Sequence, residues 1–258
     1  MSISFLYYNY CDLDSTTITA STENAFFPAD NLQDPRSTKV YRSTASSASV
    51  VFDMGAASQI DTVAIVPHFT NGLGFTGDIL LEANATNVWG APSFTTTLTS
   101  GTDIDLEFEV AYKEFSVQNL RYWRVSAAGA SYVELSRVYL GLRNTVGDRS
   151  INYGWKYKLD DNSKITKNLY GQRFSDQINR QKEFSFNFSN LDKTQVDDWF
   201  LINDYNGITK PMFMRIGCEG IVNNLFRFCG EVYLDAVPEI TNSFYARYDL
   251  SVKVSEAL

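Results

Sequence analysis

Few side chains in this sequence have the types and spacing that catalysis requires. The single histidine, His68, stands in the stretch Pro67-His68-Phe69. A serine or cysteine nucleophile that needs a histidine base would have to use His68, and no Gly-x-Ser-x-Gly turn is present to hold such a nucleophile. The zinc-binding pattern His-Glu-x-x-His and the phosphate-binding P-loop are also absent. These absences favour a protein that is not an enzyme and needs no cofactor.

Carboxylates are abundant, but their placement favours solvated charge over chemistry. Asp160-Asp161 lies in a turn-like segment and Asp197-Asp198 on a predicted helix. In residues 103–110, four acids alternate with apolar residues, so all four share one face of a predicted strand. A cation site needs oxygens that converge from several directions, so no metal site is expected. A pair of carboxylates that cleaves a glycosidic bond stays open as an alternative.

The three cysteines, Cys11, Cys218 and Cys229, match no zinc-binding spacing and are expected to be free thiols. A bond between Cys218 and Cys229 across a hairpin is left open. Aromatic residues in predicted loops are candidates for carbohydrate contact, because a flat ring can stack on a sugar. Trp89 is one candidate, although packing beneath its own loop is favoured. His68 and Phe69 are the others, with a packing or hydrogen-bonding role in the loop favoured for His68.

The charge is uneven along the 258 residues, which carry 22 Lys and Arg against 30 Asp and Glu, a net charge of −8. Residues 1–143 hold 8 basic and 15 acidic residues, whereas residues 144–258 hold 14 and 15. This shift predicts two domains, 1–143 and 144–258. The acidic balance argues against nucleic-acid binding. No apolar run is long enough to span a membrane, and the N-terminus lacks the pattern of a secretory signal peptide.

The first predicted domain consists of short strand-like segments separated by turn residues, with no amphipathic helix between them. This spacing predicts a mainly β chain that opens with an antiparallel β-sandwich or jelly roll. The segments lie at residues 49–54, 60–66, 79–83, 103–110, 121–126 and 133–140.

The same segments resemble galactose-binding-like (discoidin-type) domains over about residues 24–143, preceded by a lead-in strand. The resemblance lies in Asp30-Asn31-Leu32, Ser49–Gly55, Ile60–Ile65, Arg121–Val125 and Glu134–Gly141. It is greatest with the versions found in tailed-bacteriophage tail proteins, in which a histidine often follows the second core strand, as His68 does here. The resemblance implies a β-sandwich, whose members bind a sugar in some cases only.

The second predicted domain combines strands with one helix. Strands are expected near 151–159, 181–189, 211–216, 225–234 and 244–254, and helical spacing predicts a helix near 191–203 that starts at Asn190 or Asp192 and packs Trp199 and Phe200 in the core. This order resembles the barrel-like assembly domains of phage distal-tail and minor-tail proteins. That resemblance implies ring formation, an arm at residues 163–180, and interface candidates at Trp155, Tyr245 and Arg247.

Together the resemblances imply a structural component of a tailed-phage virion, at the tail tip or baseplate, assembled in the host cytoplasm. Its implied partners are further copies of itself in a ring, other tail proteins and, for the first domain, a host-surface glycan. Two alternatives stay open. One is a carbohydrate-binding lectin or adhesin, and the other is a virion-associated enzyme that degrades polysaccharide.

Overall fold

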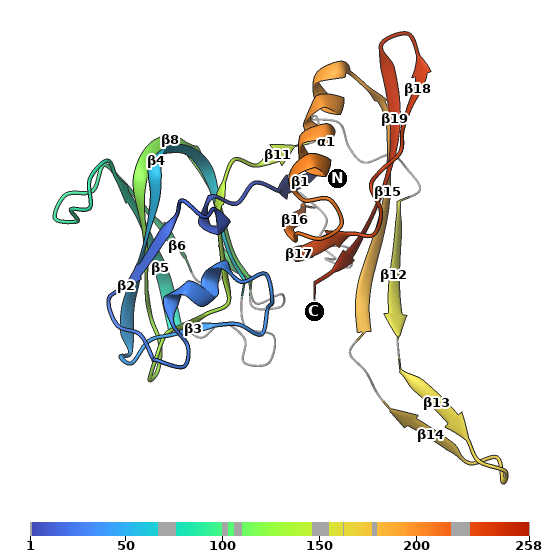
Figure 1. Ribbon diagram of the computed structural model, residues 1–258, viewed down its shortest axis with the longest axis horizontal. Helices are drawn as coiled ribbons and strands as arrows, with labels where there is room; N and C mark the ends of the chain where they lie inside the picture. The colour runs from blue at the N-terminus through green and yellow to red at the C-terminus, as the bar shows by residue number, and fades with distance from the viewer. Residues whose placement is uncertain are drawn as a thin grey trace. The chain divides into compact units, whose positions relative to one another are not determined.

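The computed structural model describes residues 2–66, 76–99, 103–105, 110–145, 155–161, 163–176, 180–217 and 228–257. Strands dominate these ranges, and one α-helix occurs within them (Figure 1). The predicted fold class, mainly β with a sandwich first and a single helix later, is therefore confirmed. Cys218 and the acidic residues Glu107 and Glu109 lie outside the described ranges.

Two compact units divide the chain, and neither is one continuous stretch. Unit 1 consists of Met1–Val146 and Met212–Glu231, and unit 2 consists of Gly147–Pro211 and Val232–Leu258. The charge shift near residue 143 thus lies close to the first division, but a later segment of the chain returns to unit 1. It returns because the strand at 212–217 pairs with the strand at the N-terminus.

Unit 1 holds most of the strands and two short 3-10 turns. Its strands are β1 (Ser2–Leu6), β2 (Thr17–Ala20), β3 (Tyr41–Arg42), β4 (Ser47–Val66), β5 (Thr76–Asn84), β6 (Phe94–Leu98), β7 (Ile104–Asp105), β8 (Val110–Ala128), β9 (Glu134–Leu135), β10 (Arg137–Gly141), β11 (Asn144–Thr145) and β16 (Met212–Gly217). The turns are η1 (Tyr10–Asp12) and η2 (Ala29–Gln33). In unit 2 the elements are β12 (Lys156–Asp161), β13 (Lys164–Lys167), β14 (Arg173–Asp176), β15 (Arg180–Leu191), α1 (Lys193–Tyr205), β18 (Ile240–Phe244) and β19 (Arg247–Glu256), and β17 (Phe228–Leu234) crosses the division.

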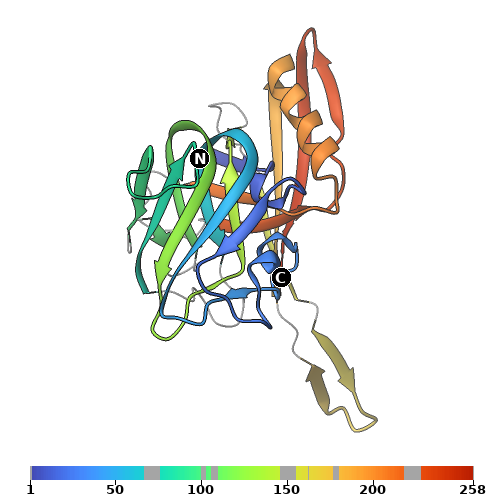
Figure 2. The ribbon, with the colours of Figure 1, turned by 60° about the vertical axis from the view of Figure 1, so that its left-hand side comes forward.

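The sandwich of unit 1 is built on two long strands, β4 and β8, which pair from Ser47–Ala128 to Ile65–Ala111 (Figure 2). Strands β2 and β5 flank their first section, and β10 and β7 flank the second. Between the sections the register shifts, and Gly55 adopts a positive φ of 74°. The prediction of two separate strands at 49–54 and 60–66 is therefore wrong, because the bulge lets one strand bend and continue.

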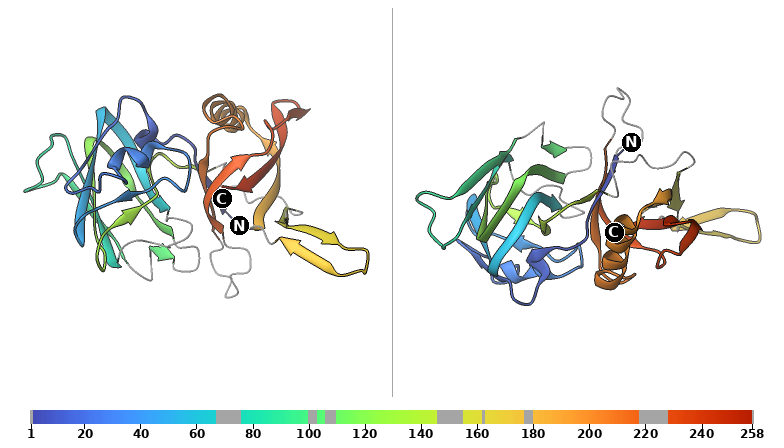
Figure 3. Two further views of the ribbon diagram at one scale, coloured as in Figure 1. Left: turned by 60° about the horizontal axis from the view of Figure 1, so that its bottom comes forward. Right: turned by 90° about the horizontal axis from the view of Figure 1, so that it is seen from above.

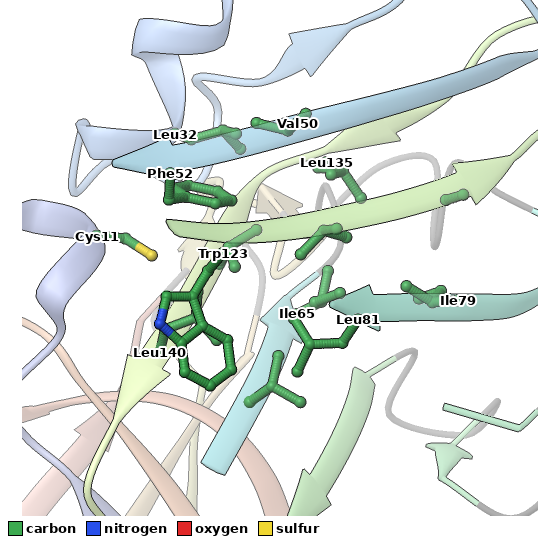
Figure 4. Packing of buried hydrophobic residues seen from close by; sticks show 14 of the residues in the cluster. Cys11, Leu32, Val50, Phe52, Ile65, Ile79, Leu81, Trp123, Leu135 and Leu140 are labelled. Atoms are coloured by element: carbon green, nitrogen blue, oxygen red, sulfur yellow. The ribbon is translucent and has the colours of Figure 1, made fainter. Parts of the chain in front are cut away.

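The core lies between the two sections, which both turn apolar side chains inward. Phe52, Leu81 and Trp123 come from the first section, and Ile65 and Leu140 from the second (Figure 4). All five are buried, so the prediction that Trp123 belongs to the core is confirmed. Burial alternates along the first section of β4 but is continuous from residue 62 to 65.

The continuous burial has a cause in a second apolar cluster on the other side of this section. That cluster brings Ala64 together with Leu6 of β1, Tyr139 of β10, Phe213 of β16 and Cys229 of β17. A strand covered on both faces reads as an unbroken apolar run, as in the Val63-Ala64-Ile65 stretch.

Unit 2 pairs β15 with β19 and packs α1 against them (Figure 3). Asp192 caps the helix and exchanges hydrogen bonds with Gln195, which confirms the second of the two predicted starts. Trp199 is buried, with its ring 5.9 Å from that of Phe188. The prediction for Phe200 is wrong, since its side chain is 52% exposed. Successive helical side chains lie about 100° apart, and Phe200 therefore turns away from the face that carries Trp199.

The last predicted strand, 244–254, is interrupted in the structure. Strand β18 ends at Phe244, and Ala246 adopts a φ of 53° in the turn before β19. Phe244, where the predicted strand begins, is 74% exposed and belongs to β18 instead of β19. Leu250, Val252 and Val254 alternate inward and are buried as the period of two requires.

Candidate functional site

Of the three residues predicted from the sequence to contact carbohydrate, the structure describes one. His68 and Phe69 lie outside the described ranges. Trp89 lies in the loop between β5 and β6 and is partly exposed. Its Nε1 donates a hydrogen bond of 2.8 Å to Asn87 Oδ1, and the Arg124 guanidinium lies 4.5 Å from its ring centroid. Trp89 therefore neither packs fully beneath its loop nor offers both faces to a ligand.

Arg124 is itself held by a carboxylate on the neighbouring strand. Its Nε donates to Glu82 Oε2 over 2.7 Å, and the Glu82 side chain is 7% exposed. Residue 82 faces residue 124 across β5 and β8, so the ion pair is a cross-strand pair on the outer face of the sheet. Glu82 therefore holds Arg124 in place, and Arg124 occupies one face of the Trp89 ring.

A more open arrangement lies where the segment after β8 meets β3. Arg42 lies between two rings, with its Cζ 4.4 Å from the Phe27 centroid and 4.6 Å from the Tyr132 centroid. Its Nε and Nη2 both contact Glu134 Oε2, at 2.7 and 2.5 Å. Phe26, next to Phe27 in the chain, is 87% exposed. We call Phe26, Phe27, Arg42, Tyr132 and Glu134 the Arg42 cluster.

Backbone bonds fix the position of each member. Arg42 donates its N–H to the Phe27 carbonyl over 3.0 Å, and its carbonyl accepts from the Asn24 N–H over 2.8 Å. The Asn24 side chain accepts from the Phe26 N–H over 3.0 Å, which forms a tight turn that presents Phe26 outward. Across the short β3–β9 pair, Arg42 stands directly opposite Glu134. The cluster is therefore preorganised by main-chain contacts between three separate segments.

Chemically, the cluster combines apolar faces with a paired charge. Phe26 and the 39% exposed Tyr132 supply flat surfaces. The Nε and Nη2 edge of Arg42 faces Glu134, so Nη1 points away from that carboxylate. Aromatic surface beside a few fixed polar groups is the usual composition of small-ligand sites.

Sequence reasoning missed this cluster, although it left a weak signal. Phe26 and Phe27 are adjacent aromatics in a segment without a helix or strand pattern, so periodicity assigns neither of them to the core. Arg42 follows Tyr41, which is buried, and therefore turns outward on the same short strand. Nothing in the sequence indicates that Glu134, 92 residues later, pairs with Arg42.

Tyr41 supports the cluster from the core side and yields a pH-dependent prediction. Its hydroxyl donates to the Thr22 carbonyl over 2.6 Å, and burial raises the pKa of Tyr41 to about 12 from 10.0. Because the pKa is raised in the folded state, the stabilising contribution is complete below pH 10 and is lost as the pH rises toward 12. Tyr41→Phe is expected to lower the unfolding free energy by about 1 kcal/mol at neutral pH.

In Tyr41→Phe, the unfolding free energy is expected to fall less steeply with rising alkaline pH than in the wild type. Urea unfolding of the wild type and Tyr41→Phe at a series of pH values between 10 and 12 measures this difference. If the unfolding free energies of the two proteins fell equally with pH over that range, Tyr41 would not be the source of the pH dependence.

A second polar cluster lies inside unit 1, where Arg137 and Glu231 are buried and Asp12 is partly exposed. Arg137, 1% exposed, donates to Glu231 Oε1 at 3.2 Å and to Asp12 Oδ2 at 2.7 Å. The Tyr139 hydroxyl donates to the same Glu231 oxygen over 2.5 Å. Burial raises the pKa of Glu231 and outweighs the Arg137 charge, which lowers it. Burial also raises the pKa of the nearby Cys11 thiol well above its usual value, which makes it a poor nucleophile.

The assembly candidates lie on unit 2, and no contact with another chain tests them. Tyr245 is 90% exposed in the turn between β18 and β19, and Arg247 begins β19. Trp155 directly precedes β12 and is partly exposed. The three residues stay predictions for an interface.

Among the described residues, no three His, Cys, Asp or Glu side chains gather closely enough to hold a metal ion. The one helix of the described chain is too short and too polar to cross a membrane.

Comparisons with known proteins give a likeness in structure alone. No family model matches the chain, and no curated protein sequence matches it. A carbohydrate-binding module from Clostridium perfringens, solved with GalNAc-beta-1,3-galactose, is 10% identical, with 52% of this chain and 100% of that chain covered and a TM-score of 0.43. The family 32 module of C. perfringens NanJ, solved with galactose, is 15% identical over 55% of this chain and 99% of its own, with the same TM-score of 0.43. A Streptococcus pneumoniae fucose-binding module is 11% identical. The match covers 52% of this chain and 98% of that module, with a TM-score of 0.43. Similarity at these levels assigns no ligand to this chain.

Proposed function

We propose that this protein is a carbohydrate-binding protein that recognises a neutral glycan at the Arg42 cluster. The observation that carries the proposal is an Arg42 guanidinium that lies between the Phe27 and Tyr132 rings and pairs with Glu134, with the exposed Phe26 next to Phe27 in the chain. A pyranose presents a face of C–H groups and an edge of hydroxyls. Phe26 suits the face, and Arg42 Nη1, which does not contact Glu134, suits the hydroxyl edge.

The charge balance of the cluster favours a neutral ligand. Glu134 neutralises Arg42 at close range, and its side chain is only 1% exposed. An anionic ligand would have to compete with this carboxylate for Arg42, whereas a hydroxyl can accept from Arg42 without breaking the pair. The rings on both sides hold the guanidinium in place, so little side-chain entropy is lost on binding.

Glycan binding by the full chain tests this proposal. A glycan array would identify a ligand, and isothermal titration would then compare wild type, Phe26→Ala and Arg42→Met. Arg42→Met is expected to weaken binding about tenfold or more, because a hydrogen bond to a charged group contributes about 1.5–3 kcal/mol and 1.4 kcal/mol is tenfold in affinity. Phe26→Ala is expected to weaken binding by a similar factor, because covering a phenylalanine ring contributes about 1.5–3 kcal/mol.

The matched control is Phe244→Ala, which removes a similarly exposed aromatic from unit 2 and should leave affinity unchanged. A full chain that binds no glycan on the array would overturn the proposal. Loss of binding in Trp89→Ala but not in Phe26→Ala would move the site to the Trp89 loop and would equally overturn the Arg42 assignment.

A second candidate function is assembly into a virion tail, which the exposed hairpin of unit 2 favours. Strands β13 and β14 form a separate two-stranded sheet, every residue of both strands is exposed, and Leu169 and Tyr170 at its tip are 102% and 92% exposed. A lone two-stranded hairpin is marginally stable in water, which suggests that a partner covers it. The hairpin lies within residues 163–180, the segment expected to be an arm that reaches a neighbouring subunit.

This second candidate places the protein at a tail tip or baseplate, with other tail proteins and copies of itself as partners. Labelling purified phage particles with an antibody against this chain, viewed by negative stain, tests it. Label at the tail tip is the expected result. A chain that is absent from purified particles would exclude the virion function and leave the glycan proposal untouched.

No observation favours the polysaccharide-degrading alternative. Asp160 accepts from Lys158 Nζ over 2.7 Å, and Asp161 accepts from Arg180 Nε over 3.0 Å. A hydrogen bond from Ser163 and the contact with Arg180 lower the pKa of Asp161, which disfavours a role as a general acid.

A further inference from the structure

Strand β12 ends the series of paired strands in unit 2. It pairs with β15 on one side, from Lys156–Ser185 to Asp161–Arg180. On its other side, no strand of the described chain pairs with it (Figure 1). Tyr157 and Leu159 on this strand are 45% and 44% exposed. An exposed strand edge with apolar side chains is a template for pairing with another chain.

The apolar residues of β12 continue the core face of unit 2 to its rim. The Tyr157 ring lies 5.4 Å from the ring of Phe184, which is 4% exposed and stacks in turn on Phe186. Leu159 lies on the same face as Tyr157, because alternate residues of a strand share a face. A second copy beside β12 would therefore extend an existing apolar surface.

The charges of β12 run from basic to acidic along the strand. Lys156 and Lys158 come first, and Asp160 and Asp161 come last. Two identical strands related by a two-fold axis normal to the sheet run antiparallel, which places the first half of each against the second half of the other. The strand is thus complementary in charge to a second copy of itself.

One register gives favourable pairs on both the charged face and the apolar face of the two strands. If the axis passes between the two Lys158 residues, Lys156 stands opposite Asp160 of the second copy, and Tyr157 stands opposite Leu159 of the second copy. Symmetry repeats both pairs. The two Lys158 residues then meet, but each already contacts Asp160 and Glu183 of its own chain, at 2.7 and 3.8 Å. A register centred on Leu159 would instead place Tyr157 opposite an aspartate.

We propose that β12 pairs with β12 of a second copy, in the register centred on Lys158, and so forms a symmetric homodimer. The dimer joins two unit 2 sheets through main-chain hydrogen bonds, two charge pairs and two Tyr–Leu pairs. This inference goes beyond the glycan proposal and does not depend on it, since the Arg42 cluster lies in unit 1.

Charge reversal tests the register. Lys156→Asp leaves two acids facing each other at each end of the pairing, and Asp160→Lys leaves two lysines. By sedimentation equilibrium of the full chain, each variant alone is expected to dimerise about tenfold more weakly or worse than wild type. An equal mixture of the two variants restores both charge pairs, because the introduced aspartate of one chain then faces the introduced lysine of the other. The mixture is therefore expected to form a heterodimer of near wild-type affinity, which also shows that both variants fold.

The matched control is Lys164→Asp, the same change on the neighbouring exposed hairpin, which should leave the dimer intact. A wild-type chain that stays monomeric would overturn the proposal. Self-association that survives in both single variants, or a mixture that fails to recover, would overturn it as well. Per-chain glycan affinity should be equal in all variants, so failure of the dimer and failure of the glycan site give different results.

Discussion

Replacing Arg137 by methionine is expected to lower the free energy of unfolding by about 3–5 kcal/mol, because the change leaves a buried carboxylate without its cation. Arg137 contacts Glu231 and Asp12 and also donates to the carbonyl of Asp34 over 3.0 Å. Its side chain is 1% exposed and that of Glu231 is 3% exposed, so water cannot replace the lost bonds. This loss of stability is larger than the loss of about 0–1 kcal/mol expected when an exposed ion pair is broken.

The pH dependence of this loss follows from Glu231. Because burial raises the pKa of Glu231 above 4.5, its folded form takes up a proton more readily than its unfolded form. Stability from this group is therefore complete below pH 4.5 and falls as the pH rises. Without Arg137, the ionised Glu231 carboxylate is less stable inside the protein. The loss of unfolding free energy in Arg137→Met should therefore become smaller at acidic pH, where Glu231 is protonated.

Urea unfolding monitored by tryptophan fluorescence measures both effects. The double variant Arg137→Met/Glu231→Leu removes both partners and is expected to recover much of the loss. Arg121→Met is the control near the surface, since Arg121 and its partner Asp53 are both partly exposed and the change should affect stability far less. A double variant no more stable than Arg137→Met would contradict the explanation.

Gly141→Ala is expected to destabilise unit 1 by about 3 kcal/mol, the upper end for adding a carbon to a packed core. A Cβ at Gly141 would approach the Tyr8 carbonyl oxygen to 2.3 Å and a Leu6 methyl carbon to 3.2 Å. The first contact is with backbone, which cannot rotate away. Tyr8 is also constrained by its neighbour Asn9, which accepts from the Leu140 N–H and donates to the Val138 carbonyl. The chain at Tyr8 therefore cannot move without breaking these bonds.

Thermal unfolding of Gly141→Ala and Gly90→Ala gives the comparison. A Cβ at Gly90 meets nothing within 4 Å, so the control should unfold close to the wild type. Equal unfolding temperatures for the two variants would show that the segment around Tyr8 yields easily, contrary to the contacts described here.

Local pattern was sufficient to predict several elements. The alternation of Phe184, Phe186 and Phe188 predicts a half-buried strand, and all three are buried in β15. Asn190 and Asp192 are the two predicted helix starts, because short side-chain acceptors satisfy free backbone donors, and the structure has Asp192 as the cap. Both signals lie within a few residues, where sequence spacing and distance in space are nearly the same.

Prediction failed where a strand changes direction or a residue lies at the edge of a pattern. Gly55 resembles a strand end but sits in a bulge, because β8 pairs with β4 on both sides of it. Phe244 continues the alternation of the last strand in sequence, but the turn at Ala246 reverses the chain first. Neither outcome is fixed by the residues nearby, since each depends on which distant strand is available for pairing.

Composition and periodicity were enough to establish that this chain is mainly β with a helix, that its acidic charge lies in residues 1–143, and that motifs for common catalytic sites are missing. The place where a ligand site can form became visible in the folded chain alone. Phe27, Arg42, Tyr132 and Glu134 come together from three segments, and Arg42 and Glu134 are 92 residues apart. Side-chain periodicity reports which face a residue takes on its own strand, but which strands become neighbours depends on the burial of the whole core. The same limit holds for β12. Its charge order is visible in the sequence, whereas its edge, which no strand of the described residues pairs, is a property of the fold.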